Sequence, residues 1–220
     1  MLAVATALDA KELDLHGTSL AIKQHTGKGP LEIQNAAHLH GALAGLKSGE
    51  YVVVGDVGDY FGVLTDGATL RVKGNAGKYV ADNMTRGTVI VEGSADYGAG
   101  LYPYGGTLVV LGNAGDFTAT MNKGATIIVG GNVGAECGTY HLAGDFVVVG
   151  NAGLNFGNFL IRGTLYLGGE AESYGRNTCL EPMQTEDLDK LRRWFEQYGI
   201  QADPAKFKKL VAKSTKPFYE

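Results

Sequence analysis

The stretch Gly112–Gly134, GNAGDFTATMNKGATIIVGGNVG, contains two copies of a Gly-Asn-x-Gly tetrapeptide with an apolar run before the second copy. The copies start at Gly112 and Gly131, which are 19 residues apart. Glycine loops of this kind occur where backbone N–H groups cradle a phosphate, and also where a chain turns sharply between strands. The surrounding sequence distinguishes the two readings.

Steps of 19 residues from Gly112 reach a glycine in both directions. Seven glycines fall in register without an insertion: Gly55, Gly74, Gly93, Gly112, Gly131, Gly150 and Gly169. The next position holds Asp, Asn, Ser or Glu, and the one after it holds Ala or Val. This repeat is too short for a helical hairpin of about 34 residues, so it predicts a coil built from strands.

Each repeat also carries a short strand that ends at its glycine. The column two residues before the glycine is Val53, Val72, Val91, Val110, Val129, Val148 and Leu167. Apolar residues also stand four before it, and both columns share one strand face because side chains alternate. A second glycine column precedes the strands, with spacings of 18 to 20 residues that predict small bulges: Gly49, Gly67, Gly87, Gly106, Gly124, Gly144 and Gly163.

These columns predict an all-β fold, a single-stranded right-handed parallel β-helix of about seven 19-residue coils with short flanking helices at both termini. Paired strands lie about 4.8 Å apart, so seven coils form a prism about 30 Å long. We expect the Ala/Val column to fill a corner and the Asn column to form an amide ladder between neighbouring side chains. Asn and Gly are also expected to supply the positive φ that the corner needs.

Three regions follow from this pattern. Residues 1–48 form an N-terminal flank and cap with one helix, expected in LEIQNAAHLHGALAGL (31–46), and residues 49–175 form the β-helix. Residues 176–220 form a C-terminal helical tail. In the tail, an amphipathic helix over 183–198 has Thr185 as its N-cap and Gly199 as its C-cap. A second short helix starts at Asp203 and Pro204.

The outward-facing side of the strands is unusually apolar. Its central column is Val52, Arg71, Ile90, Val109, Ile128, Val147 and Tyr166. An apolar outer face needs a cover. Either the terminal helices of the chain provide it, or another subunit does, which would include self-association through this face.

Composition excludes several partners. The net charge of −4 comes without a basic stripe, so we expect no nucleic-acid partner. The apolar N-terminal run ends at Asp9, and no stretch reaches the ~18 apolar residues of a membrane helix, so we expect no membrane partner. The two cysteines, Cys137 and Cys179, fit a reducing compartment, and we expect a cytoplasmic protein.

Residues with chemical potential are scattered along the sequence. His38 and His40 are two apart on the expected helix and point to different faces. The carboxylates that stand at varied offsets in different coils, and form no acid–base pair, are Asp96, Asp116, Glu136 and Asp145. The remaining histidines are isolated in sequence: His16, His25 and His141. We therefore predict no catalytic, cofactor-binding or metal-binding residue in this chain.

Other functional readings fit the repeat less well. A dinucleotide site needs a helix after its glycines, and calcium-binding β-rolls repeat an Asp every nine residues. Hexapeptide acyltransferases have coils of 18 residues rather than 19. Cys137 stands four residues before His141, and a Cys–His pair can activate a thiolate, so an independent enzyme using these two residues is retained as an alternative.

The segment RGTVIVEGSADYGAGLYPYGGTLVVLGNAGDFTATMNKGATIIVGGNVG (86–134) resembles the C-terminal GXGXG β-helix domain of the glutamate synthase large (alpha) subunit. The resemblance covers about residues 49–175. The tail FEQYGIQADPAKFKKL (195–210) is similar to stand-alone versions of this domain, which are separate subunits of archaeal glutamate synthases and N-methylglutamate synthases. A sister branch is the β-helix subunit of formylmethanofuran dehydrogenase and of the formyltransferase/hydrolase complex. One coil departs from the pattern, because KYVADNM (78–84) lacks the Gly-Ala-Gly of that corner.

The resemblance implies a scaffold, a subunit of an oxidoreductase complex without an active site of its own. In glutamate synthases, an amidotransferase domain hydrolyses glutamine and a barrel domain with FMN and a three-iron cluster reduces 2-oxoglutarate plus ammonia. This chain starts with Met and has two cysteines, fewer than such a cluster needs. The implied partners are a glutamine amidotransferase-like subunit and an FMN-binding synthase subunit, which would carry the FMN and the iron–sulfur cluster. The alternative is the equivalent scaffold of a formylmethanofuran dehydrogenase or formyltransferase/hydrolase complex.

Overall fold

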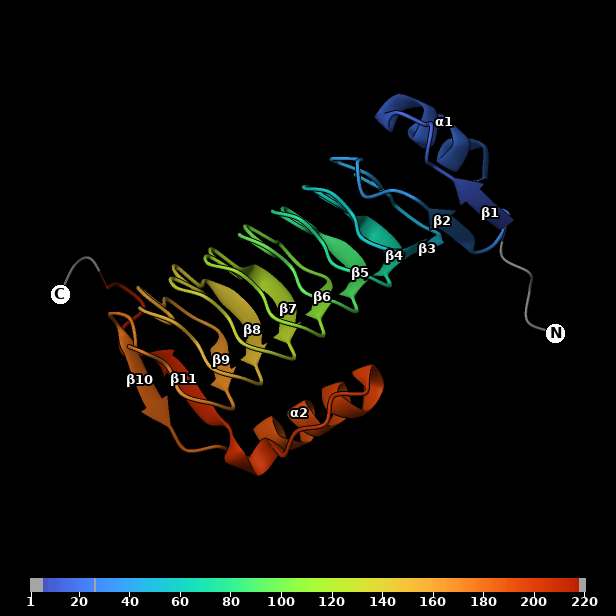
Figure 1. The fold of residues 1–220 in the computed structure, drawn as a ribbon. Coiled ribbons are helices and arrows are strands. Elements are labelled where there is room, and N and C mark those ends of the chain that lie inside the picture. Colours follow the sequence, from blue (N-terminus) through green and yellow to red (C-terminus); the bar gives the residue numbers. More distant parts are fainter. Residues whose placement is uncertain (1–5, 26, 218–220) are drawn as a thin grey trace.

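The computed structural model describes residues 6–25 and 27–217. The first five residues of the apolar N-terminal run lie outside the described residues. The chain winds into a β-solenoid in which parallel strands stack along one axis, with α1 near one end and α2 alongside the later strands (Figure 1). The predicted parallel β-helix of about seven coils with short flanking helices is therefore confirmed.

The elements follow one another along the chain from one end of the solenoid to the other. The strands are β1 (Thr6–Asp9), β2 (Leu31–Gln34), β3 (Glu50–Val54), β4 (Asp66–Val72), β5 (Arg86–Val91), β6 (Thr107–Val110), β7 (Lys123–Val129), β8 (Ala143–Val148), β9 (Thr164–Leu167), β10 (Thr178–Glu181) and β11 (Lys208–Ala212). The helices are α1 (Leu15–His25), α2 (Thr185–Tyr198) and a 3₁₀ turn (Pro204–Lys206).

The strands form one sheet in the order β1-β2-β3-β4-β5-β6-β7-β8-β9-β11-β10. Successive strands from β3 to β9 pair in parallel, and Leu108 lies opposite Ile127, one repeat later. The register shifts in two pairings, between Asp66 and Thr69 and between Lys123 and Thr126. These shifts lie at the second glycine column and confirm the expected bulges there.

The interior of the prism is filled by the two apolar columns of the strands. Their side chains from β4 to β9 have no exposed surface: Leu70, Val72, Val89, Val91, Leu108, Val110, Ile127, Val129, Phe146, Val148, Leu165 and Leu167. The Ala/Val column adds a continuous line of parallel bridges from Val57 to Ala171 along one corner. Burying each large aliphatic side chain contributes about 1.5–3 kcal/mol, so the coils are held together from inside.

The side chains of the Asn column accept hydrogen bonds from the backbone of the next coil. The prediction that they bond to one another as an amide ladder is therefore wrong. Asn113 Oδ1 accepts the N–H of Asn132 at 2.8 Å, and Asn132 Oδ1 accepts the N–H of Asn151 at 2.8 Å. The same bond continues to the N–H of Glu170. A side-chain oxygen therefore replaces a backbone carbonyl at each step, and Ser94 serves equally well because its hydroxyl oxygen also accepts.

The glycine that precedes each Asn is explained by the close stacking of the coils. The prediction that this corner needs positive φ is wrong. Among the seven repeat glycines, Gly55 alone has a positive φ, at 101°. A Cβ on Gly93 would lie 2.5 Å from Asn75 Oδ1 and 2.7 Å from the Gly74 carbonyl oxygen. The glycine is therefore required by the close approach of the coil beneath it.

Positive φ occurs at two other places in each coil. The second glycine column has it throughout, from Gly49 at 100° to Gly163 at 79°. Each coil also has three alternate positive-φ residues at its remaining corner. In two successive coils these are Tyr60, Gly62 and Leu64 (58°, 62° and 57°) and Tyr79, Ala81 and Asn83 (60°, 55° and 55°). KYVADNM therefore keeps the corner geometry without its glycines.

Neighbouring coils hold this strained corner in place. A non-glycine residue at positive φ costs about 1–2 kcal/mol. The Tyr79 N–H donates to the Tyr97 carbonyl of the next coil at 2.9 Å, and the Ala81 N–H donates to the Phe61 carbonyl of the previous coil at 2.9 Å. Each corner is thus bonded on both sides, and the stack as a whole offsets the local strain.

The N-terminal flank corrects the predicted helix over residues 31–46. Leu31–Gln34 is β2, which pairs in parallel with both β1 and β3. The residues after it form turns that include positive φ at Gly41, Leu43 and Gly45. The apolar spacing of this segment is therefore that of one more coil, and the helix is α1, earlier in the chain. The three predicted domain bounds stay predictions.

The C-terminal tail confirms one predicted helix and corrects another. Gly199 is the C-cap of α2, with φ 68°, as predicted. The helix begins at Thr185 itself, because Gln184 rather than Thr185 is its N-cap. Asp203 accepts the Ala205 N–H at the 3₁₀ turn. The expected second helix ends there, because Lys208–Ala212 is β11, which pairs antiparallel with β9 and β10. This pairing covers the strand edge that the last coil would expose.

α2 covers the apolar outer face within the same chain. Leu191 and Phe195 of α2 and Phe207 pack on the outer column from β5 to β9: Ile90, Val109, Ile128, Val147 and Tyr166. Arg71 of β4 pairs with Glu92 at 2.7 Å at the margin of this face. Of the two predicted covers, the terminal helix of the chain is the one observed over β5 to β9. Self-association through this face stays a prediction.

Asp187 anchors the start of α2. Its Oδ1 accepts the Tyr166 hydroxyl at 2.6 Å, and its Oδ2 accepts the Gln184 N–H at 2.9 Å and Lys209 Nζ at 3.0 Å. Burial raises the Asp187 pKa, but the bonds from Tyr166, Gln184 and Lys209 outweigh burial and hold it below its usual value. Lys190 adds a second tie from α2 to Asp145 at 3.0 Å.

We predict that Gly93→Ala lowers the free energy of unfolding by about 2 kcal/mol, because the new methyl group forces adjacent coils apart. Urea unfolding followed by circular dichroism measures the change. Gly17→Ala in α1 is the matched control, because its Cβ meets only the Asp14 and Leu13 side chains, at 3.2 Å or more. Equal stability of Gly93→Ala and the wild type would contradict the close-approach explanation.

We predict that Asp187→Asn destabilises the packing of α2 by about 3 kcal/mol, because Lys209 loses its buried partner. Trp194, the single tryptophan, lies in α2 and reports the change by fluorescence during denaturation.

The effect of this substitution should depend on pH. The folded pKa of Asp187 is lowered, so the stability that its carboxylate contributes is complete above the unfolded pKa of about 4 and is lost as pH falls through the folded pKa. The wild type and Asp187→Asn should therefore differ at pH 5–8 and converge below pH 4. Asp189→Asn, an exposed α2 carboxylate paired with Arg192, should show little change.

Candidate functional site

The Gly-Asn-x-Gly corner has no backbone donors left for a phosphate. In the copy at 131–134, the Gly131 N–H bonds the Gly112 carbonyl at 2.9 Å and the Asn132 N–H bonds Asn113 Oδ1 at 2.8 Å. The Val133 and Gly134 N–H groups bond carbonyls of the next and previous coils at 2.8 and 3.2 Å. An anion would have to displace these bonds, so the corner is structural.

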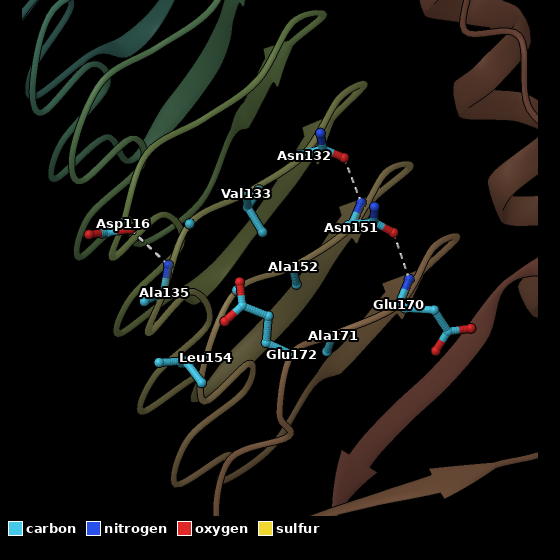
Figure 2. Close-up of a pocket in the computed structure, with 12 residues that line it drawn as sticks. Asp116, Asn132, Val133, Ala135, Asn151, Ala152, Leu154, Glu170, Ala171 and Glu172 are labelled. Carbon is cyan, nitrogen blue, oxygen red and sulfur yellow. Dashed lines mark hydrogen bonds between the residues drawn. The ribbon is translucent and has the colours of Figure 1, made fainter.

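An open groove of about 700 Å³ lies along this corner in the last coils. Figure 2 shows its lining, with the Asn132 and Asn151 side chains along one border and carboxylates of other coils around it. The charged residues that line it are Asp116, Glu170 and Glu172. A groove lined by carboxylates repels anions, which is a second reason against a nucleotide here.

Each carboxylate singled out in the sequence has a separate structural contact. Asp96 and Asp116 each accept a backbone N–H, from Tyr97 at 2.7 Å and from Ala135 at 2.8 Å. Glu136 accepts from the Asn155 side chain at 2.6 Å, and Asp145 accepts from Lys190 of α2. The structure does not bring any two of them together as an acid–base pair.

The histidines are likewise held by backbone groups. His38 Nε2 lies 2.9 Å from the Leu13 carbonyl, and His25 Nε2 lies 3.1 Å from the Gly29 carbonyl. His40 Nδ1 accepts the Asp59 N–H at 3.1 Å, while His16 is exposed on α1. His38 and His40 lie in turns rather than on the expected helix. Across residues 6–25 and 27–217, no three His, Cys, Asp or Glu side chains gather into a metal-binding group.

Cys137 and His141 both point into the prism. The Cys137 Sγ lies 3.4 Å from the Gly115 carbonyl oxygen, and burial raises the pKa of its thiol to about 12. His141 Nε2 lies 3.2 Å from the Gly144 carbonyl, and burial lowers the pKa of its imidazole to about 4. The thiol stays protonated and enclosed at neutral pH, so the geometry opposes an enzyme that uses these two residues.

A further group of exposed apolar side chains lies on or beside the strained corner, and the sequence did not reveal it. Tyr60, Leu64, Tyr102 and Tyr104 are 45%, 56%, 37% and 57% exposed. The sequence did contain a pattern that could have revealed these side chains, because aromatic or aliphatic residues recur there at steps of about 19. It could be read only once the corner and its outward direction were known.

Two comparisons with known proteins bear on these observations. In a scan of protein-family models, residues 50–213 match the model described as GXGXG motif. This match covers well over half of the chain. A search of curated proteins found no match. Neither α1 nor α2, the α-helices of the described part, is long and apolar enough to cross a bilayer.

We predict that Cys137 resists alkylation by iodoacetamide at pH 8 in the folded chain, because its thiol is enclosed and its pKa is about 12. Peptide mapping by mass spectrometry measures modification at each cysteine, and the same reaction in guanidinium gives the unfolded reference. Cys179, which is partly exposed, is the internal comparison. Rapid, complete modification of Cys137 in the folded chain would restore the Cys137–His141 alternative.

Proposed function

The chain belongs to the GXGXG motif family, that of the glutamate synthase C-terminal domain, and from this we propose that it is a non-catalytic structural subunit of a glutamate-synthase-type complex. The complex would transfer the amide nitrogen of glutamine to 2-oxoglutarate. A glutamine amidotransferase-like subunit and an FMN-binding synthase subunit would carry the two half-reactions. The FMN and the iron–sulfur cluster belong to these partners in the proposal, which assigns no residue of this chain to hold them.

The structural observation that supports the proposal is the continuous bonding of the coils. From Asp56 to Glu170, a side-chain oxygen of each coil bonds a backbone N–H of the next. Bonding on both sides of every interior coil makes the prism a rigid rod with faces in fixed register. A rigid rod suits a part that holds two other subunits at a constant separation, so that ammonia passes between them without escaping to water.

The burial of the two residues that could form a catalytic pair supports the same structural role. Cys137 and His141, the pair that a catalytic reading requires, serve as packing groups inside the coils. Cys137 and Cys179 are both free thiols, in keeping with the cytoplasmic location that we propose. The scaffold of a formyl-transfer complex stays an alternative prediction, which the choice of partner subunits in the experiment below separates.

We predict that the isolated chain neither binds FMN nor hydrolyses glutamine, and that it is required for coupled turnover by its partners. The amidotransferase-type and FMN-binding subunits from the same organism are purified and mixed with and without this chain. Glutamate formed from glutamine and 2-oxoglutarate is measured, with ammonia in place of glutamine as the control for the synthase alone. The chain should raise glutamine-dependent synthesis at least tenfold and change ammonia-dependent synthesis little. Equal glutamine-dependent rates with and without it would refute the scaffold role.

A further inference from the structure

The strained corner carries two rows of side chains along the prism, and all of them are apolar except Asn83. The first row consists of Tyr60, Tyr79, Tyr97 and Phe117, whose successive ring centroids lie 4.9, 5.5 and 5.2 Å apart. The second row consists of Leu64, Asn83, Tyr102, Met121, Tyr140 and Phe159. Both rows, with Tyr104 beside them, are called the corner edge below.

The corner edge contrasts with the outer strand face. The strand face is equally apolar, but α2 covers it. Figure 1 shows the corners of the coils on the side of the prism away from α2. Among the described residues no helix or strand packs over this edge, and Leu64 and Tyr104 are more than half exposed. A contiguous exposed apolar strip on a rigid element is typical of a protein interaction site.

The rings of the first row are already ordered. Stacking between neighbouring coils fixes Tyr60 against Tyr79 with an interplanar angle of 18°. Ordered tyrosines bind a partner with little further loss of side-chain entropy, which is one reason why they are common at the centres of interfaces. Stacking alone accounts for the contact between rings, but it does not require Leu64, Tyr102 and Tyr104 to be apolar.

The charge beside the first row is acidic and without a counter-ion. Asp96 and Asp116 stand directly before Tyr97 and Phe117, and each uses one carboxylate oxygen to accept a backbone N–H. Within the described residues, no Lys or Arg lies within ion-pair distance of either. Lys78, directly before Tyr79, is a cation beside the same row. The acidic groove of Figure 2 borders the same side and extends this field.

Two of the cations on the other side of the corner edge are already engaged. Lys123 Nζ lies 4.0 Å from the Tyr104 ring centroid, and Arg86 pairs with Asp66 at 2.9 Å. The uncommitted charge beside the aromatic row is therefore mainly negative, and the chain as a whole carries −4. A second copy would bring more negative charge and few free cations to this edge, whereas a basic surface would complement it.

We propose that the corner edge is the docking surface for a partner subunit whose contact strip is apolar and flanked by lysine or arginine. Arginine suits the site because its guanidinium group pairs with a carboxylate while its flat face lies on an aromatic ring. Asp96 and Asp116 would orient such side chains through the carboxylate oxygen that the backbone leaves unused. This inference rests on the proposed function, because it identifies the face through which the scaffold holds a partner.

The chain supplies conservative variants for the test. Asn83 occupies the second-row position at φ 55°, so Leu64→Asn with Tyr102→Asn removes the apolar groups and keeps a residue that tolerates positive φ. Asp96→Asn with Asp116→Asn removes two charges and keeps an oxygen for each backbone N–H. The matched controls are Leu20→Asn with Leu180→Asn, at exposed leucines off the edge, and Asp189→Asn with Glu196→Gln on α2. Circular dichroism confirms that each variant is folded.

Binding is measured with the purified amidotransferase-type and FMN-binding synthase-type subunits of the same organism as probes. The apolar edge variant should weaken the Kd for one of them by about tenfold or more. The Asp→Asn variant should slow association and reduce its dependence on salt, since the charge steers the encounter. Both controls should bind like the wild type.

The other outcomes are distinct. If the wild type binds a probe and both edge variants bind equally well, the corner edge is not the docking surface, and the proposed function stands. If the wild type binds neither probe, the proposed function and this inference fail together. If sedimentation shows that the wild type is a dimer and Leu64→Asn with Tyr102→Asn makes it a monomer, the edge binds a second copy, and the partner assignment is overturned.

Discussion

The fold depends on one constraint, the fit of each coil against the next at a fixed register of 19 residues. The strands favour that register, because a slip by one residue would turn their buried apolar columns to the other face. The Gly-Asn corner reinforces it, since an Asn oxygen bonds the N–H of the Asn one coil on, as Asn113 bonds Asn132. The glycine before each of these N–H groups leaves room for that oxygen. A slip by one residue would place a Cβ where the oxygen must lie.

Other features follow from this register. Positive φ at Tyr79 and Ala81 would be unfavourable in an isolated turn, but bonds to the coils on either side hold it here. The same stacking gathers like side chains into rows, so that Ile127 lies on Leu108 inside the prism and Tyr79 lies on Tyr60 outside it. A side chain repeated at the same position of each coil therefore becomes a continuous surface rather than an isolated residue.

The two long apolar surfaces of the prism are treated differently by the chain. The strand face is sealed by α2, which Asp187 ties to Tyr166 and Lys209 and which Lys190 ties to Asp145. The corner edge is also largely apolar, and no helix or strand covers it among the described residues. This asymmetry suits a scaffold, because one apolar face completes the fold and the other stays available for association.

The sequence by itself determined the strand-and-corner repeat, its interior columns and the inert setting of the glycine loops, because these recur in every coil and periodicity reveals them. It did not determine the flanks, where no repeat applies. Leu31–Gln34 has an apolar spacing that also fits a helix, and only pairing with β3 decides that it is a strand. Lys208–Ala212 follows a helix-starting Asp-Pro, yet it pairs with the open edge of β9 and forms β11.

The cover of Tyr166 by α2 and the exposure of Tyr60 and Leu64 were decided by tertiary structure as well. Local sequence indicates which side chains share a face, but only packing shows which face is covered.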